Sequence, residues 1–207
     1  MNHKNMLGVL IKYPEPGKVK TRLAKHIGTE EAASFCRRIA EHVLKRTAPA
    51  DFGYLRIVFY TPDEMRQQFA DWLPDELLKV QRGKDVGERM ENALEEMFAL
   101  GAEKAIVVGA DIPGLHREII DHAFQNLDHA DMVIGPAMDG GYYLIGMKSP
   151  YPEIFWNIAW GTGEVFRKTV DNIEKKGLHY RAVKILFDVD GLGDFLKAEE
   201  MMKDAEN

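Results

Sequence analysis

The sequence predicts an α/β fold, in which buried strands alternate with amphipathic helices. Two short, apolar and partly β-branched runs, 7–11 and 105–109, have the composition of strands that are covered on both faces. Each run is followed within a few residues by Pro and Gly, which turn the chain out of a sheet. Between them, the segment 29–46 carries apolar residues at helical spacing, with Thr29 as its expected N-cap.

The remaining segments continue this alternation. An Asp-Gly-Gly sequence at 139–141 separates two strand-like runs and predicts a hairpin. On the helix that starts at about Asp85, Val86 and Met90 are expected to face the core, as is the lone Cys36 on its own helix. Further strands are expected at 54–60, 79–81, 131–137, 142–147 and 180–187, and further helices at 63–69, 85–100, 118–127, 165–176 and from 194 onward.

Length and charge limit the classes of protein to consider. A chain of 207 residues with 45% hydrophobic residues suits one domain, and we expect that domain to span 1–207. A formal net charge of −6 argues against a nucleic-acid-binding surface. One cysteine excludes an intramolecular disulfide, and the first residues contain too few apolar side chains for a signal peptide. With no run long enough to span a membrane, a cytoplasmic location is expected.

Asp111 is the acid that follows the apolar run 105–109. In open α/β sheets, ligands bind outside the carboxyl ends of the strands, so an acid at this position is placed to meet a substrate or a metal ion. The alternative is structural, because Asp also caps helices and one is expected to begin near Leu115. This stretch alone does not separate the two possibilities.

The loop after the first strand is basic. Lys18, Lys20 and Arg22 surround Thr21 at the expected start of a helix, where free N–H groups and cationic side chains favour phosphate. The alternative is a solvated basic turn. The preceding buried strand and the stiffening prolines favour the phosphate site. The loop is not a Walker loop, because the lysine lacks the required glycine spacing and a following Ser or Thr.

Two glycine-containing stretches predict close contact with a ligand. At Gly83 and Gly87 the backbone is expected to approach a nucleotide, although a simple turn explains these glycines nearly as well. At the expected hairpin, Asp139 stands beside two glycines and paired tyrosines, which together make a polar site with aromatic walls.

Two acids near the end of the chain, Asp188 and Asp190, are two residues apart in an extended segment and therefore point to the same side. Together with Asp111 they supply oxygen ligands suited to a hard divalent cation, with phosphate and water completing the shell. The alternative is that Asp188 and Asp190 are exposed surface acids that bind no metal ion. The histidines lack zinc-site spacing, and neither a Gly-x-Ser-x-Gly nor a Gly-x-Gly-x-x-Gly motif is present.

Taken together, these motifs resemble a family of small bacterial and archaeal proteins assigned to the nucleotide-diphospho-sugar transferases, glycosyltransferases of the GT-A fold. The resemblance covers most of the chain, and a more distant one is to the phospholactate guanylyltransferases. The matching motifs are Lys12-x-Pro-x-Pro-Gly-x-x-Lys20-Thr-Arg-Leu, Gln81-x-Gly-x-Asp-x-Gly87-Glu-Arg-Met, Gly109-x-Asp111-x-Pro-x-Leu, Gly135-Pro-Ala-x-Asp139-Gly-Gly-Tyr-Tyr-Leu-Ile-Gly and Trp160-x-Thr162.

The resemblance implies a three-layer α/β/α fold with a mixed, mostly parallel sheet that binds a nucleotide over the carboxyl ends of its strands. It matches Asp111 to a metal-binding acid. The chain departs from the family at Ile112 and Gly161, where Ser is frequent, and at 191–193, where related nucleotidyltransferases carry Thr-Pro-Glu. The last departure leaves the roles of Asp188 and Asp190 open. The phosphate-binding turn is matched to Lys12, Gly17, Lys20 and Arg22.

Our leading expectation is a metal-dependent glycosyltransferase with a nucleotide-sugar donor, in which Mg²⁺ or Mn²⁺ is held by Asp111 and Asp190 and Gly87 lies against the nucleotide. Asp139 would orient or deprotonate an acceptor hydroxyl. The second hypothesis is a nucleotidyltransferase that joins a nucleoside triphosphate to a small phosphorylated substrate. The third is a protein that binds nucleotides without catalysis. For a transferase, the acceptor substrate is expected to bind at Gly140, Gly141, Tyr142 and Trp160.

Overall fold

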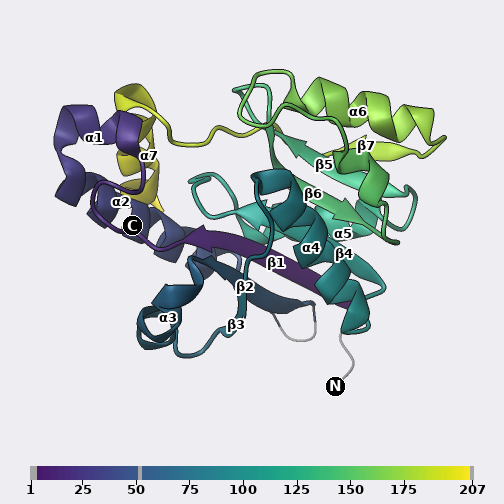
Figure 1. The fold of residues 1–207 in the computed structure, drawn as a ribbon, viewed down its shortest axis with the longest axis horizontal. Coiled ribbons are helices and arrows are strands. Elements are labelled where there is room, and N and C mark those ends of the chain that lie inside the picture. The colour runs from purple at the N-terminus through teal and green to yellow at the C-terminus, as the bar shows by residue number, and fades with distance from the viewer. Residues whose placement is uncertain (1–3, 51–52, 206–207) are drawn as a thin grey trace.

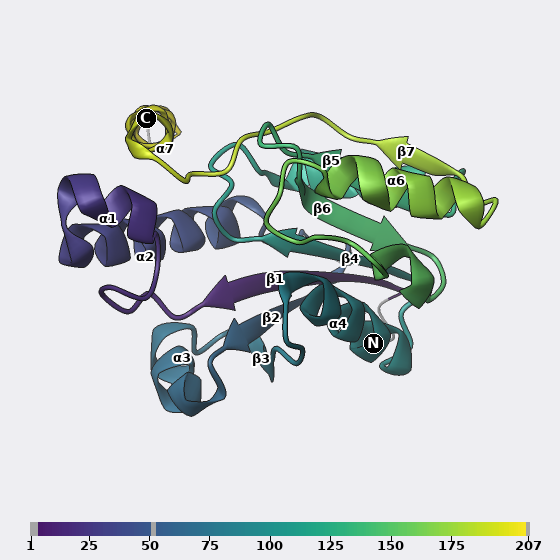
Figure 2. The same cartoon turned by 45° about the horizontal axis from the view of Figure 1, so that its top comes forward.

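The computed structural model describes residues 4–50 and 53–205, and its centre is a seven-stranded sheet (Figures 1 and 2). The strand order is β3-β2-β1-β4-β6-β5-β7. The strands are β1 (Asn5–Lys12), β2 (Leu55–Thr61), β3 (Leu77–Val80), β4 (Lys104–Gly109), β5 (Met132–Pro136), β6 (Tyr142–Met147) and β7 (Tyr180–Ala182).

The sheet is mixed and mostly parallel, as expected. β1 pairs in parallel with β2 and β4, and β7 pairs in parallel with β5, whereas β6 runs antiparallel between β4 and β5. Leu10 of β1 lies opposite Gly109 of β4, so these two central strands end at the same edge. The basic loop after β1 and the acid after β4 therefore leave the sheet side by side.

Helices cover both faces of the sheet, which confirms the three-layer architecture. One apolar core joins the sheet to α2, α3 and α5, and a second joins its other face to α4 and α6. A third, smaller core packs α7 against α1 and α2, as Figure 2 shows. The helices are α1 (Thr21–Ile27), α2 (Thr29–Arg46), α3 (Arg66–Trp72), α4 (Val86–Ala99), α5 (Arg117–Asn126), α6 (Val165–Lys175) and α7 (Leu192–Asp204), with 3₁₀ turns η1 (Asp63–Met65) and η2 (Pro152–Phe155).

Several local predictions were wrong. Gly28 is the N-cap of α2 and Thr29 its first helical residue, without a side-chain capping bond. Val86 is 45% exposed because it lies in the first turn of α4, beside a cavity. The last strand stops at Ala182 instead of 187, although a bridge between Ala137 and Leu186 keeps the following segment against the sheet.

The hairpin predicted at 139–141 is confirmed, because β5 and β6 pair on either side of it. Asp111 does not cap α5, whose N-cap is His116. A capping role for Asp111 is thereby removed. Among helices of the described chain, none has the length and apolar character needed to cross a bilayer.

Candidate active site

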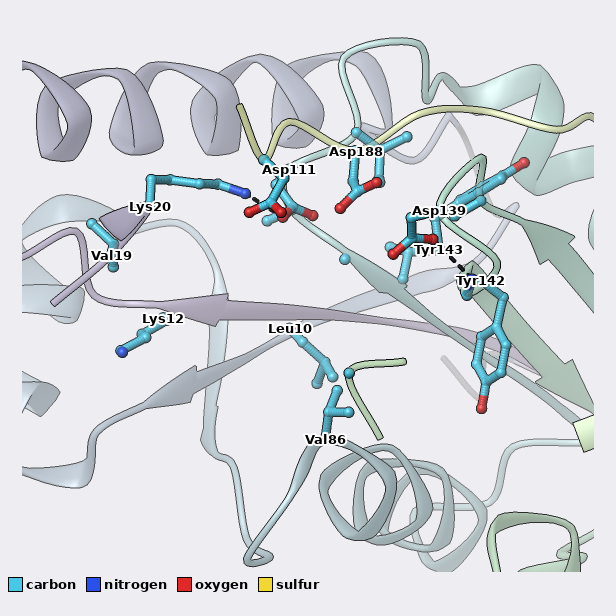
Figure 3. A pocket seen from close by; sticks show the side chains of 18 of the residues that line it. Leu10, Lys12, Val19, Lys20, Val86, Asp111, Asp139, Tyr142, Tyr143 and Asp188 are labelled. Carbon is cyan, nitrogen blue, oxygen red and sulfur yellow. Dashed lines mark hydrogen bonds and ion pairs between the residues drawn. The ribbon is translucent and has the colours of Figure 1, made fainter. Parts of the chain in front are cut away.

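A cavity of about 560 Å³ lies over the carboxyl ends of β1 and β4 (Figure 3). Its walls come from the β1–α1 loop, the end of β4, the β5–β6 turn, the 160–162 turn and the segment 188–190. The cavity brings together most of the residues that the sequence nominates: Lys12, Lys20, Arg22, Asp111, Asp139, Gly141, Tyr142, Trp160 and Asp190.

Lys20 and Asp111 form an ion pair at the centre of one wall. The Lys20 Nζ donates to Asp111 Oδ2 at 2.6 Å, and their side chains are 12% and 37% exposed. Burial disfavours the charge on Lys20, but the adjacent Asp111 carboxylate outweighs it, and the net result is a raised pKa for Lys20. Lys20 also has a left-handed backbone, with φ 44° and ψ 44°, which is unusual for a residue with a Cβ.

The segment 188–190 is anchored beside Asp111 by the backbone. The Val189 N–H donates to the Asp111 carbonyl at 3.3 Å, and the Val189 side chain is buried in the core of α1, α2 and α7. Because side chains alternate along an extended segment, Asp188 and Asp190 both face the cavity, as the sequence predicts.

These two acids have different surroundings. Burial raises the pKa of Asp188, and the neighbouring carboxylates of Asp111 and Asp139 raise it further. Asp190 instead forms an ion pair with Arg22. Both acids line the cavity with Asp111, which the sequence nominates together with Asp190, and Figure 3 shows Asp188 beside Asp111. The alternation of side chains along the segment predicts that both acids face the same side. It does not predict which of them forms an ion pair with Arg22.

The acids of the cavity are only partly neutralised. Within residues 4–50 and 53–205, Asp111 and Asp190 have cationic partners, while neither Asp139 nor Asp188 forms an ion pair. The same part of the chain holds no cluster of three or more His, Cys, Asp or Glu side chains arranged for a metal ion. A cation here would need further oxygens from water or from a bound ligand, which is how Mg²⁺ is usually held at phosphate sites.

The β5–β6 turn is shaped by close contacts. Asp139 Oδ1 accepts the Gly141 N–H at 2.8 Å, so this exposed carboxylate stabilises its own turn. Gly140 has φ +89°, and a Cβ there would overlap the Gly163 carbonyl. Gly140 does not line the cavity, and its glycine is explained by the close contact between the two turns.

The aromatic wall combines Tyr142 with Trp160, whose rings meet edge to face at 6.4 Å between centroids. The Tyr142 hydroxyl points away from the aspartates (Figure 3) and is buried, which raises its pKa. Tyr142 therefore offers the cavity only its ring. The Tyr143 hydroxyl is also engaged elsewhere, since it donates to the Lys184 carbonyl at 2.7 Å.

Two glycines that the sequence nominates for nucleotide binding have structural explanations in packing and in turn geometry. A Cβ on Gly87 would overlap the Trp160 indole, so the glycine allows α4 to pack against that ring. Gly17 has φ +77° and open space around it, which is typical of a turn. Neither residue lines the cavity.

Lys12, Lys18 and Cys36 complete the wall around Lys20. The Lys12 Nζ donates to the Lys18 carbonyl at 2.6 Å, and the Lys18 ammonium pairs with Glu15. Cys36 is half-buried at the cavity rather than within the core, and burial raises the pKa of its thiol. A thiol with a raised pKa stays protonated and is a weak nucleophile.

The family model described as "Uncharacterized protein conserved in bacteria (DUF2064)" matches residues 44–162, which is more than half of the chain. A 2-phospho-L-lactate guanylyltransferase of Methanocaldococcus jannaschii is 25% identical over 182 residues, covering 87% of this chain and 75% of the relative. A phosphoenolpyruvate guanylyltransferase of Chloroflexus aggregans is 24% identical over 159 residues, covering 72% of this chain and 76% of the relative.

A crystal structure from Desulfovibrio desulfuricans G20, described as a candidate nucleotide-diphospho-sugar transferase, has a TM-score of 0.85. It is 29% identical, and 97% of each chain is covered. A Mycobacterium tuberculosis protein solved with manganese shares the fold at a TM-score of 0.56 and 16% identity, with 94% of this chain and 98% of that chain covered. The expected fold and the expected transferase class are both confirmed by these relationships.

Proposed function

The chain belongs to the DUF2064 family, and for this member we propose nucleotidyl transfer from a nucleoside triphosphate to a small phosphorylated acid. The observation that carries the proposal is the grouping of Asp111 and Asp188 with Lys20 in one cavity at the carboxyl ends of the central strands. Acids that attract a cation and a lysine that attracts phosphate are the groups that handling a triphosphate requires.

The relatives favour this reaction over glycosyl transfer, our leading expectation from the sequence. Two curated relatives are named guanylyltransferases, and their names specify phosphorylated three-carbon acids as acceptors. The structural neighbour described as a nucleotide-diphospho-sugar transferase is compatible with this proposal, because one fold supports both reactions. The homologues therefore support the alternative that the sequence left in second place.

In the proposed reaction, an oxygen of the acceptor phosphate attacks the α-phosphorus of the triphosphate. A new phosphorus–oxygen bond forms as the bond from the α-phosphorus to its bridging oxygen breaks, and pyrophosphate leaves with the electron pair. Lys20 and Arg22 line the cavity, and in this proposal they bind phosphate oxygens and stabilise the charge that develops on the leaving group. Lys12, at the rim of the same wall, would add to this positive field.

The donor set suits a divalent cation, since Asp188 has no ion-pair partner among the described residues and lies in the field of Asp111 and Asp139. We propose Asp111 and Asp188 as the protein ligands of Mg²⁺ or Mn²⁺, in place of the Asp111 and Asp190 pair. When bound, such a cation would neutralise the phosphates and help to align them. The Tyr142 and Trp160 rings form an apolar wall for the acceptor or the base, and Gly141 brings backbone close to it.

The test is pyrophosphate release from each nucleoside triphosphate, with 2-phospholactate or phosphoenolpyruvate as acceptor and Mg²⁺ or Mn²⁺ present. We expect release that depends on the acceptor. Asp111→Asn should lower kcat/KM by on the order of 100-fold or more, because it removes a charge that holds the cation. Asp75→Asn, at an exposed acid outside the cavity, is the matched control and should leave the rate unchanged.

Two results would contradict the proposal. Release of a nucleoside diphosphate from a sugar nucleotide, with no reaction of triphosphates, would establish glycosyl transfer. Triphosphate binding without turnover of any acceptor would support the non-catalytic alternative.

A further inference from the structure

We propose that the Lys20 ammonium neutralises Asp111 while no divalent cation is bound, and that it moves to the triphosphate when the cation binds. The consequence is that cation and triphosphate bind cooperatively, each weakly when alone. The inference rests on the proposed function, because the cation that displaces Lys20 is the cation of that reaction.

The ion pair places a competing positive charge on the carboxylate that the cation would bind. The Lys20 Nζ lies 2.6 Å from Asp111 Oδ2. Mg²⁺ would need to approach that oxygen to about 2.0–2.1 Å, and Mn²⁺ prefers similar oxygen ligands. An ammonium and a metal ion that share one carboxylate lie a few ångströms apart, and in this partly buried site their positive charges repel each other. The cation and the Lys20 ammonium therefore compete for Asp111, and binding of the cation favours release of Lys20.

The backbone holds the lysine in position while its side chain remains able to pivot. The left-handed conformation of Lys20 is maintained by the Ala24 N–H, which donates to the Lys20 carbonyl at 2.8 Å, and by the buried side chain of Val19 just before it. Lysine has a flexible four-carbon stem, so its ammonium can turn from one anion to another without movement of the loop.

A displaced Lys20 needs a new anion, because its side chain is only 12% exposed and an unpaired buried charge is costly. Asp188 is the other carboxylate close enough to influence the Lys20 charge, but the same cation would occupy it. Asp190 is already paired with Arg22. Triphosphate oxygens are thus the anions that can receive Lys20, and this links the two binding events.

The linkage is reciprocal, as any coupling between two binding equilibria must be. A cation that binds alone must leave Lys20 without a partner. A triphosphate that binds alone competes with Asp111 for Lys20 and leaves the acids of the cavity without a cation. When both bind, the cation pairs with Asp111 and Asp188, and Lys20 pairs with the triphosphate.

The experiment measures Mn²⁺ binding without nucleotide, from the electron paramagnetic resonance signal of the free ion. Lys20→Met removes the competing charge at nearly constant length, and we expect it to bind Mn²⁺ at least about 10-fold more tightly than the wild type. Lys20→Arg keeps the charge and should bind as weakly as the wild type. Lys25→Met removes a charge from the same helix, outside the cavity, and should also match the wild type.

Equal Mn²⁺ affinities for the wild type and Lys20→Met would overturn the inference. The proposed function would survive that result if α,β-methylene GTP still brought Mn²⁺ to the wild type. Failure of Mn²⁺ to bind any variant, with or without the analogue, would overturn both the inference and the proposed cation.

A second measurement on the wild type does not depend on the folding of a variant. Acetylation of lysines by an amine-reactive ester, read by mass spectrometry, reports whether each ammonium is free. Mg²⁺ alone should accelerate labelling of Lys20 relative to Lys25, because displacement from Asp111 releases the amine. An unchanged ratio would contradict the exchange.

Discussion

Asp139 differs from the other acids of the cavity because its carboxylate is already hydrogen-bonded within its own turn. Its Oδ1 accepts the Gly141 N–H, while Asp111 and Asp188 are the acids that we propose as cation ligands. A hydroxyl acceptor would need a base, which is the role expected for Asp139 in glycosyl transfer. A phosphate acceptor arrives with its attacking oxygen already ionised and needs none.

Asp139→Asn therefore separates the two reactions. The amide oxygen can still accept the Gly141 N–H, so the turn should persist. For nucleotidyl transfer to a phosphorylated acid, we expect kcat/KM to stay within about 10-fold of the wild type, with the same pH profile. A loss of about 10²–10⁴-fold together with a changed pH profile would assign the base role to Asp139.

Among the helices and strands, the first turn of α4 is held against the cavity wall by Gly87. The glycine is buried, and any side chain at this position would overlap the Trp160 indole. Trp160 in turn packs against Tyr142 and Phe155. The contact therefore places the aromatic wall relative to α4.

Gly87→Ala should lower the free energy of unfolding by about 1–3 kcal/mol, because the methyl group has no space beside the rigid indole. Gly193→Ala is the matched control. Gly193 is also the second residue of its helix, and a Cβ there meets nothing within 4 Å, so alanine should be neutral or stabilising by up to about 1 kcal/mol. Denaturant unfolding measures both, and equal effects would contradict a packing role for Gly87.

The elements could be predicted because their patterns are local. The helix at 29–46 has the predicted bounds, and the central strands follow from short apolar runs. The reasons for Gly87 and Gly140 could not be found in this way. Each glycine accommodates a partner, Trp160 or Gly163, that lies far along the chain. A glycine in the sequence indicates that another group lies close to the backbone, but it does not identify that group.

Across the molecule as a whole, the site is assembled from both ends of the chain. Lys20 follows the first strand, Asp111 follows the fourth, and Asp188 lies just before the last helix. The position of Asp111 was predictable, since an acid after a buried strand lies at a known edge of an α/β sheet. Our proposal of Asp188 rather than Asp190 as the second cation ligand could not be reached from the sequence, because it depends on the ion pair between Arg22 and Asp190.

The proposed reaction joins a nucleoside monophosphate unit to a phosphorylated acid within one cavity. Phosphorus NMR of a mixture containing protein, GTP, phosphoenolpyruvate or 2-phospholactate, and Mg²⁺ tests it most directly. We expect pyrophosphate together with two mutually coupled phosphorus resonances, those of a new anhydride between the GMP unit and the acceptor phosphate. An unchanged spectrum with every triphosphate and both acceptors, alongside conversion of a sugar nucleotide to its nucleoside diphosphate, would contradict it.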